Sequence, residues 1–136
     1  MWISTKIGLI ASVLASLFGI PLSMLLVRFD FRGKGIIDSF SNLPLIIPQV
    51  ALSIAILQMF SLLKIRIDII TLILAHTVII IPYVIRAVVS SMHFVDYSVE
   101  EAAMNLGANR FQTFLYITFP LIRSGVTAGF ILSFIM

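Results

Sequence analysis

The stretch that decides the fold is residues 98–120, SVEEAAMNLGANRFQTFLYITFP, which lies between two apolar runs. Ser98 and Glu101 have the spacing of a capping box, in which each side chain accepts a hydrogen bond from a free backbone N–H at a helix start. Gly107 stands where such a helix ends in the left-handed conformation. The pattern predicts a short helix whose apolar face comprises Val99, Ala102, Ala103 and Leu106.

A second short helix is predicted directly after this turn. Asn109 and Gln112 repeat the capping-box spacing. Pro120 interrupts whatever helix reaches it, because proline lacks a backbone N–H and its ring crowds the preceding turn. We therefore expect a helix, a tight turn, a helix, a kink and then a membrane span. The apolar face of the second helix comprises Phe111, Phe114 and Leu115.

The composition is that of an integral membrane protein. Of 136 residues, 60% are hydrophobic and 11% are charged, which is more apolar surface than a soluble domain of this length could bury. The net charge of +3 comes from basic residues that flank apolar runs, so we expect contact with membrane lipids and not with nucleic acid. Cysteine is absent, no phosphate-binding glycine loop occurs, and neither histidine has a carboxylate at metal-ligand spacing. We expect no catalytic residue, metal or cofactor.

The hydrophobic pattern predicts an all-α bundle with about four membrane spans, at residues 7–27, 43–63, 69–85 and 120–136. Pro44 and Pro48 stand at the start of the second span, where proline costs little. A cleavable signal peptide is the alternative interpretation of the first run. Small residues line one face of the first and last spans, which favours close helix approach in lipid: Gly8, Ser12, Ser16 and Gly19, and Gly125, Gly129 and Ser133.

The basic residues predict the orientation of these spans. The connections at 28–38 and 86–123 share one side and hold six of the nine lysines and arginines, whereas the other side holds three. Because basic residues accumulate on the cytoplasmic side, we expect a multi-pass protein of a bacterial cytoplasmic membrane with residues 98–119 in the cytoplasm.

The decisive stretch also carries a family pattern: Glu101-Ala102-Ala103, three residues, Gly107, nine residues, Ile117, one residue and Phe119-Pro120. This pattern resembles the EAA loop of permease subunits of binding-protein-dependent ABC importers, with Phe119 where leucine is usual. The resemblance implies the permease helix bundle, and a coupling loop at 98–119 that docks on a separate ATPase subunit. It also implies that Gly107 makes the turn between two short helices.

Weaker similarities extend over most of the chain. Residues 28–34, RFDFRGK, resemble the basic connection of these permeases, and residues 43–48, LPLIIP, resemble the start of their next span. Residues 74–76 and 81–83 resemble a span of the polyamine-type branch. Family members usually have about six spans, so with four predicted here the chain is expected to be truncated or divergent.

Several residues are candidates for a functional role. Glu101 is the first candidate for an ATPase contact, although capping its own helix also explains it. Glu100 is expected in the aqueous headgroup zone near the helix start. Within the third span, His76 and Pro82 are candidates for the transport pathway, and ordinary helix packing explains them equally well. The remaining candidates for ATPase contact are Glu100, Arg110 and Phe111.

The sequence therefore predicts a permease subunit that couples ATP hydrolysis on another chain to transport by alternating access. The resemblance implies three protein partners: an ABC ATPase, a second permease subunit and an extracytoplasmic substrate-binding protein. The alternative is a truncated membrane protein that still docks on an ABC ATPase but transports nothing. A membrane-embedded enzyme is disfavoured, because the spans lack a zinc-protease motif, an acid pair and a thiol.

Overall fold

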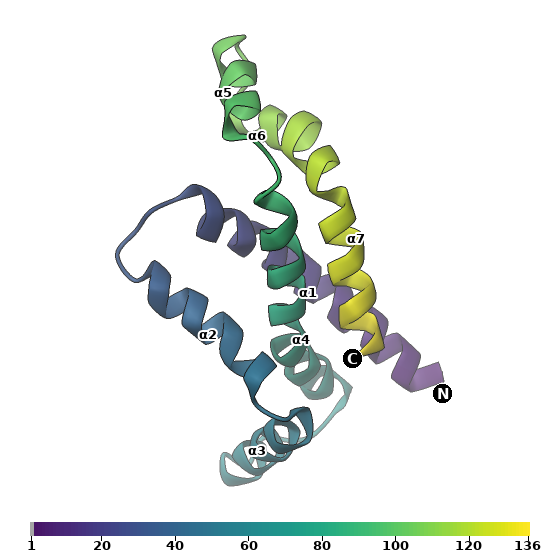
Figure 1. Cartoon of the computed structure of the whole chain (residues 1–136). Helices are drawn as coiled ribbons and strands as arrows, with labels where there is room; N and C mark the ends of the chain where they lie inside the picture. The colour runs from purple at the N-terminus through teal and green to yellow at the C-terminus, as the bar shows by residue number, and fades with distance from the viewer. Residues whose placement is uncertain (1) are drawn as a thin grey trace.

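The computed structural model describes residues 2–136, apart from the side chains at 40, 44 and 45, and these residues form helices and connecting turns without a strand (Figure 1). Eight segments follow one another along the chain. They are α1 (Trp2–Arg28), α2 (Lys34–Ile46), α3 (Gln49–Leu62), α4 (Ile69–Met92), α5 (Tyr97–Asn105), α6 (Arg110–Thr113), the π-helix η1 (Phe114–Thr118) and α7 (Phe119–Ile135).

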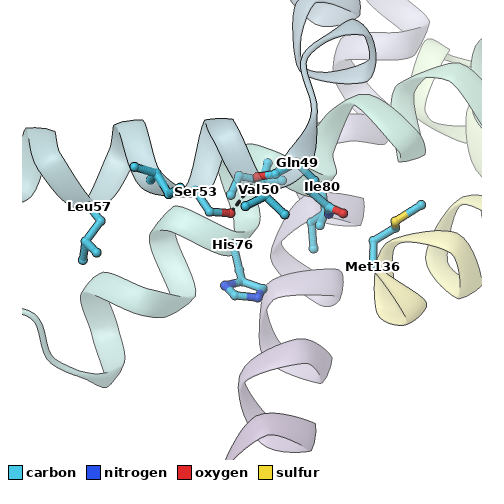
Figure 2. A pocket seen from close by; sticks show the side chains of 9 residues that line it. Gln49, Val50, Ser53, Leu57, His76, Ile80 and Met136 are labelled. Atoms are coloured by element: carbon cyan, nitrogen blue, oxygen red, sulfur yellow. Dashed lines mark hydrogen bonds between the residues drawn. The ribbon is translucent and has the colours of Figure 1, made fainter.

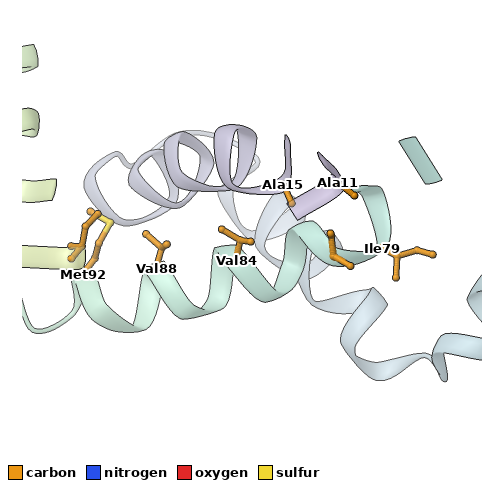
Figure 3. Packing of buried hydrophobic residues seen from close by; sticks show 8 residues of the cluster. Ala11, Ala15, Ile79, Val84, Val88 and Met92 are labelled. Carbon is orange, nitrogen blue, oxygen red and sulfur yellow. The ribbon is translucent and has the colours of Figure 1, made fainter. Parts of the chain in front are cut away.

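Three long helices, α1, α4 and α7, form the core. In Figure 3, buried side chains form a row on α4 from Ile79 to Met92, and Ala11 and Ala15 of the neighbouring α1 lie near the Ile79 end of this row. Val84, Val88 and Met92 are buried on α4, and Ala11 and Ala15 are buried on α1. The core is therefore built from large aliphatic residues on α4 and small residues on its neighbour.

Glycines bring the backbones of these helices together. A Cβ atom added at Gly19 of α1 would lie 2.9 Å from Val84 Cγ1, and one added at Gly129 of α7 would lie 3.1 Å from Val84 Cα. A Cβ atom at Gly125 would lie 2.7 Å from the backbone oxygen of Ala87. The prediction that small residues mark the packing faces of the first and last spans is confirmed at these positions.

Much of the remaining surface is apolar. The accessible surface is 9138 Å², against roughly 7,100 Å² for a compact soluble monomer of this length. Large aliphatic and aromatic side chains contribute to it along α1, α4 and α7. Three helices, Trp2–Arg28, Ile69–Met92 and Arg110–Ile135, are long and apolar enough to cross a membrane. The prediction of an all-α polytopic membrane fold is confirmed.

The segment predicted as a span at 43–63 differs from the expectation. The chain there forms the end of α2 and the 14-residue α3, separated by Ile47 in an extended conformation and Pro48 as the N-cap of α3. Proline disfavours the helical conformation in the residue before it, so the helix ends at Ile46. At 1.5 Å per residue α3 is about 21 Å long, less than the roughly 30 Å hydrocarbon layer. A membrane crossing in this segment stays a prediction.

Helices α2 and α3 form an arm that extends from the core (Figure 1). No residue of α3 is buried. The arm is tied to α4 by Arg86, whose Nη2 donates to Asp38 Oδ1 over 2.7 Å and to the backbone oxygen of Asp38 over 3.2 Å. A polar contact thus takes the place of close helix packing at this position.

Candidate functional site

The loop between α4 and α7 begins with a cap on α5 that differs from the predicted one. Asp96 is the N-cap, and its carboxylate accepts a hydrogen bond of 2.9 Å from the backbone N–H of Ser98. This bond is the main cause that lowers the pKa of Asp96. The predicted capping box of Ser98 and Glu101 is wrong, because the helix starts at Tyr97 and Ser98 already lies in its first turn.

The turn after α5 has the geometry expected from Gly107. The φ angle of Gly107 is 97°, in the left-handed region. The Ala108 N–H donates to the Ala103 oxygen over 3.1 Å, and the Gly107 N–H donates to the Met104 oxygen over 3.0 Å. These two bonds make a Schellman turn, which closes the C-terminal end of α5.

The predicted capping box of the second helix is confirmed. The Gln112 N–H donates to the Asn109 side chain, the Asn109 N–H donates to the Gln112 side chain, and both distances are 2.9 Å. Helix α6 starts directly after this box, at Arg110. Both sides of the turn are thus fixed by hydrogen bonds within the loop itself.

Helix α6 continues without a break through η1 into α7, so the loop and the last membrane helix form one rod, Arg110–Ile135. The Phe119 N–H donates to the Phe114 oxygen, five residues earlier, which is the hydrogen bond of a π-helix. Pro120 lies in the first turn of α7. The wider turn ahead of Pro120 accommodates a ring that would crowd a regular α-helix. Figure 1 shows a change of direction between α6 and α7.

Glu100 lies inside the protein and joins three segments. Its Oε1 accepts a hydrogen bond of 2.8 Å from Arg28 Nη2 at the end of α1 and one of 2.9 Å from Thr118 Oγ1 at the end of η1. Only 6% of Glu100 is exposed, so the prediction that it lies in the aqueous headgroup zone is wrong. The Arg28 guanidinium also lies over the Tyr97 ring, 5.1 Å from its centroid.

The opposite face of the loop is open. Glu101 and Ala102 are exposed, and so are Arg110 and the apolar side chains of Leu106 (89%) and Phe111 (71%). The apolar face predicted for α5 therefore points away from the core over most of its length. The rest of the family pattern lies closer to the body or in the rod: Ala103 and Ile117 are half-buried and Pro120 is exposed.

The two pathway candidates lie on α4, away from the loop. Pro82 is buried in the core, within a helix that runs unbroken from Ile69 to Met92. His76 is exposed and lines a cavity of about 410 Å³, together with Gln49 and Ser53 of α3 (Figure 2). Among residues 2–136, no group of three or more histidine and acidic side chains is placed to hold a metal ion.

The fold defines a polytopic helical membrane protein with a capped helix–turn–helix between α4 and α7. The sequence profile described as "Binding-protein-dependent transport system inner membrane component" matches residues 11–136. The chain belongs to this family of integral inner-membrane permease components, which confirms the resemblance found in the sequence.

Individual relatives carry several transport names. The chain is 33% identical to a probable sulfate transport system permease protein of Prototheca wickerhamii, with 95% of the chain and 55% of the relative covered. It is 30% identical to the spermidine/putrescine permease protein PotC of Escherichia coli K12 (96% and 50% covered). It is 32% identical to the molybdenum permease protein ModB of the same strain (97% and 63% covered). The chain thus spans between half and two thirds of the length of these relatives.

Proposed function

We propose that this chain forms part of the transmembrane permease of an ATP-driven importer, and that the α5–α6 loop docks on a separate ATPase subunit in the cytoplasm. The observation that carries the proposal is the construction of the loop. Its turn is closed by Gly107 on one side and by the Asn109–Gln112 box on the other. A loop fixed in this way keeps its shape under load, whereas a frayed one would absorb the motion of the partner.

The exposed face of the loop suits a cleft on another protein. Leu106 and Phe111 present apolar surface, while Glu101 and Arg110 present charges beside it. An apolar centre with a polar rim is the usual composition of a protein interface. In this proposal Glu101 and Arg110 contact the ATPase at the edge of the cleft, and Leu106 and Phe111 enter it.

The continuous rod Arg110–Ile135 supports a mechanism for coupling. When ATP closes the ATPase dimer, the docked loop moves, and α7 moves with it because no flexible linker separates the two. The spans then tilt between inward and outward openings, which is alternating access. A second permease subunit completes the walls of the path, and a binding protein delivers the solute. The relatives named for sulfate, molybdenum and polyamines suggest a small charged solute.

The orientation of the loop is directly testable, because the chain contains no cysteine. We expect a Leu106→Cys variant to react with a membrane-impermeant maleimide in inverted membrane vesicles and not in intact cells. Leu106 is suited to this test, since it is exposed and caps nothing with its side chain. Labelling in intact cells would place the loop outside and would exclude docking on a cytoplasmic ATPase.

Docking itself is tested by Gly107→Val. Valine is strained at a φ of 97°, by at least the 1–2 kcal/mol that the left-handed conformation costs an ordinary residue, so we expect recovery of the ATPase with the chain to fall about tenfold. The amount of chain in the membrane should not change. Gly35→Val is the matched control, because a Cβ atom there also meets open space and Gly35 has no positive φ.

Equal recovery of the ATPase with both variants would contradict the docking proposal. Full ATPase binding by the wild-type chain in its native membrane, with no uptake dependent on ATP, would instead support the alternative of a non-transporting interaction protein.

A further inference from the structure

We propose that Glu100 is the positioning residue that transmits movement of the docked loop to the first and last membrane helices together. The inference rests on the proposed function, since it concerns how the same loop acts once an ATPase is bound. It assigns to Glu100 a role inside the chain, different from the contact with the partner proposed for its neighbour Glu101.

One oxygen atom connects the three segments. Glu100 Oε1, in the first turn of α5, is 2.8 Å from Arg28 Nη2 of α1 and 2.9 Å from Thr118 Oγ1 of η1. Arg28 lies 72 residues from Glu100 in sequence, and Thr118 lies 18 residues from it. A displacement of α5 therefore acts on α1 through a hydrogen-bonded ion pair, and on the rod that contains α7 through the Thr118 hydroxyl.

The surroundings make this link dependent on the Glu100 charge. The side chains of Arg28 and Glu100 are only 13% and 8% exposed. Arg28 Nε is buried and has no hydrogen-bond partner among residues 2–136, so the Glu100 carboxylate provides the counter-charge for a guanidinium that is already short of partners. Breaking one side of such a pair is costly, because it leaves a desolvated charge without compensation.

Packing is open beside the link, so side-chain density alone does not fix α5 against α1. A cavity of about 190 Å³ adjoins Arg28 and Glu100 and is also lined by the flexible side chains of Met24 and Met104. Movement is transmitted by dense packing where helices touch closely, as at Gly125 and Gly129. Where a cavity intervenes, directional polar bonds have to carry it.

The test measures the ATP-dependent distance between α1 and α7, which needs no knowledge of the solute. Spin labels at Leu17→Cys and Ile131→Cys, both exposed side chains, report this distance in the whole protein reconstituted with its ATPase subunit. ATP with vanadate should change the distance in the otherwise wild-type protein. We expect Glu100→Gln to reduce that change at least threefold, and Thr118→Val to reduce it about twofold.

The decisive variant is the double substitution Arg28→Leu with Glu100→Leu. Replacing both members of a buried ion pair by apolar residues of similar size generally preserves folding. We expect this variant to bind the ATPase as the wild type does and to lose the distance change. The double substitution Asp38→Leu with Arg86→Leu removes the other inter-helix ion pair and serves as the control, in which the change should persist.

The outcomes separate the two proposals. Absence of ATPase binding by the labelled protein that retains Arg28 and Glu100 would refute the proposed function. Normal binding with an undiminished distance change in the Arg28→Leu, Glu100→Leu variant would overturn the role of Glu100 alone. A distance change lost equally in the Asp38→Leu, Arg86→Leu control would also overturn it, because any inter-helix ion pair would then serve.

Discussion

The core helices and the segments that project from them are attached in different ways. In the core, glycines let α1 and α7 approach α4 so closely that a single methyl group at Gly19, Gly125 or Gly129 would crowd the neighbouring helix. The arm of α2 and α3 and the α5–α6 loop are joined to the core helices by the ion pairs Arg86–Asp38 and Arg28–Glu100, and half-buried Leu52 and Ile56 of α3 add apolar contacts in the arm.

This difference suggests a division of labour. Contacts between small residues are short-ranged, so they keep the spans close together and permit only small displacements between them. An ion pair at the end of a long side chain allows a small change of angle between the segments that it joins, and it still transmits a larger displacement from one segment to the other. The core helices are therefore expected to shift only slightly against one another when the loop is displaced, whereas the arm can change its position relative to them by a larger amount.

The role of close packing in the core, as opposed to ion pairs in the arm and the loop, is tested most severely at Gly125. Leucine there would collide with Ser91 and with the backbone of Ala87, so we expect α7 to separate from α4 at a cost of about 3 kcal/mol or more. Thermal unfolding in detergent, followed by the monodisperse fraction on size exclusion, measures the effect. Ala128→Leu is the control, since Ala128 is exposed on the same helix. Equal loss in both variants would mean that the close contact does not hold the core.

A smaller loss of stability is expected when the ion pair that holds the arm is weakened. Asp38→Asn weakens the ion pair with Arg86, whose side chain is 32% exposed while that of Asp38 is 47% exposed, so the loss should be roughly 0.5–1 kcal/mol. Hydrogen exchange of α2 should rise a few-fold while exchange in α4 stays constant. Asp30→Asn removes only the exposed pair with Lys34 and should leave α2 unchanged. Faster exchange throughout α4 would show that the arm and the core are not separate units.

The smallest effect is expected at the start of the loop, where protonation of Asp96 removes the N-cap of α5. Because the Ser98 N–H stabilises the Asp96 carboxylate, the pKa of Asp96 in the folded loop lies below its ordinary value of about 3.9. The cap therefore contributes fully above that value and is lost as the pH falls through the lowered pKa. The Ser98 amide resonance should shift between pH 5 and pH 2 in the wild type, and much less in Asp96→Asn, which keeps an acceptor that does not titrate. Matching shifts in both proteins would show that Asp96 does not cap α5.

Local patterns were predictable where the residues that make a feature lie close together in sequence. The turn at Gly107 and the Asn109–Gln112 box depend on neighbours within a few residues, and both are confirmed. The small-residue faces were also readable, since helical spacing alone places Gly125 and Gly129 on one side of α7. The cap on α5 was misassigned because Asp96 and Ser98 are both good capping residues, and spacing alone did not choose between them.

Features that depend on distant residues were not predictable. The partner of Glu100 is Arg28, and no pattern in the sequence indicates a pairing across 72 residues. From the sequence, Glu100 is expected to be solvated, because it lies between two predicted spans. In the structure, the end of α1 lies beside it and supplies Arg28 as a partner. The break at Pro48 does have a local signal, because a proline inside an apolar run can separate two helices as readily as it can begin one.

The π-helix at residues 114–118 sets the direction in which the loop faces. A π-turn contains about one residue more than an α-turn, and each α-helical residue advances the azimuth by roughly 100°. The wide turn therefore fixes the phase between the exposed side of α6 and the glycine stripe of α7. If residues 110–135 formed a regular α-helix, the Phe111 side chain would project from a different side of the helix, while every contact of Gly125 and Gly129 stayed in place. A single-residue insertion or deletion in this family can thus re-aim the loop without disturbing the packed spans.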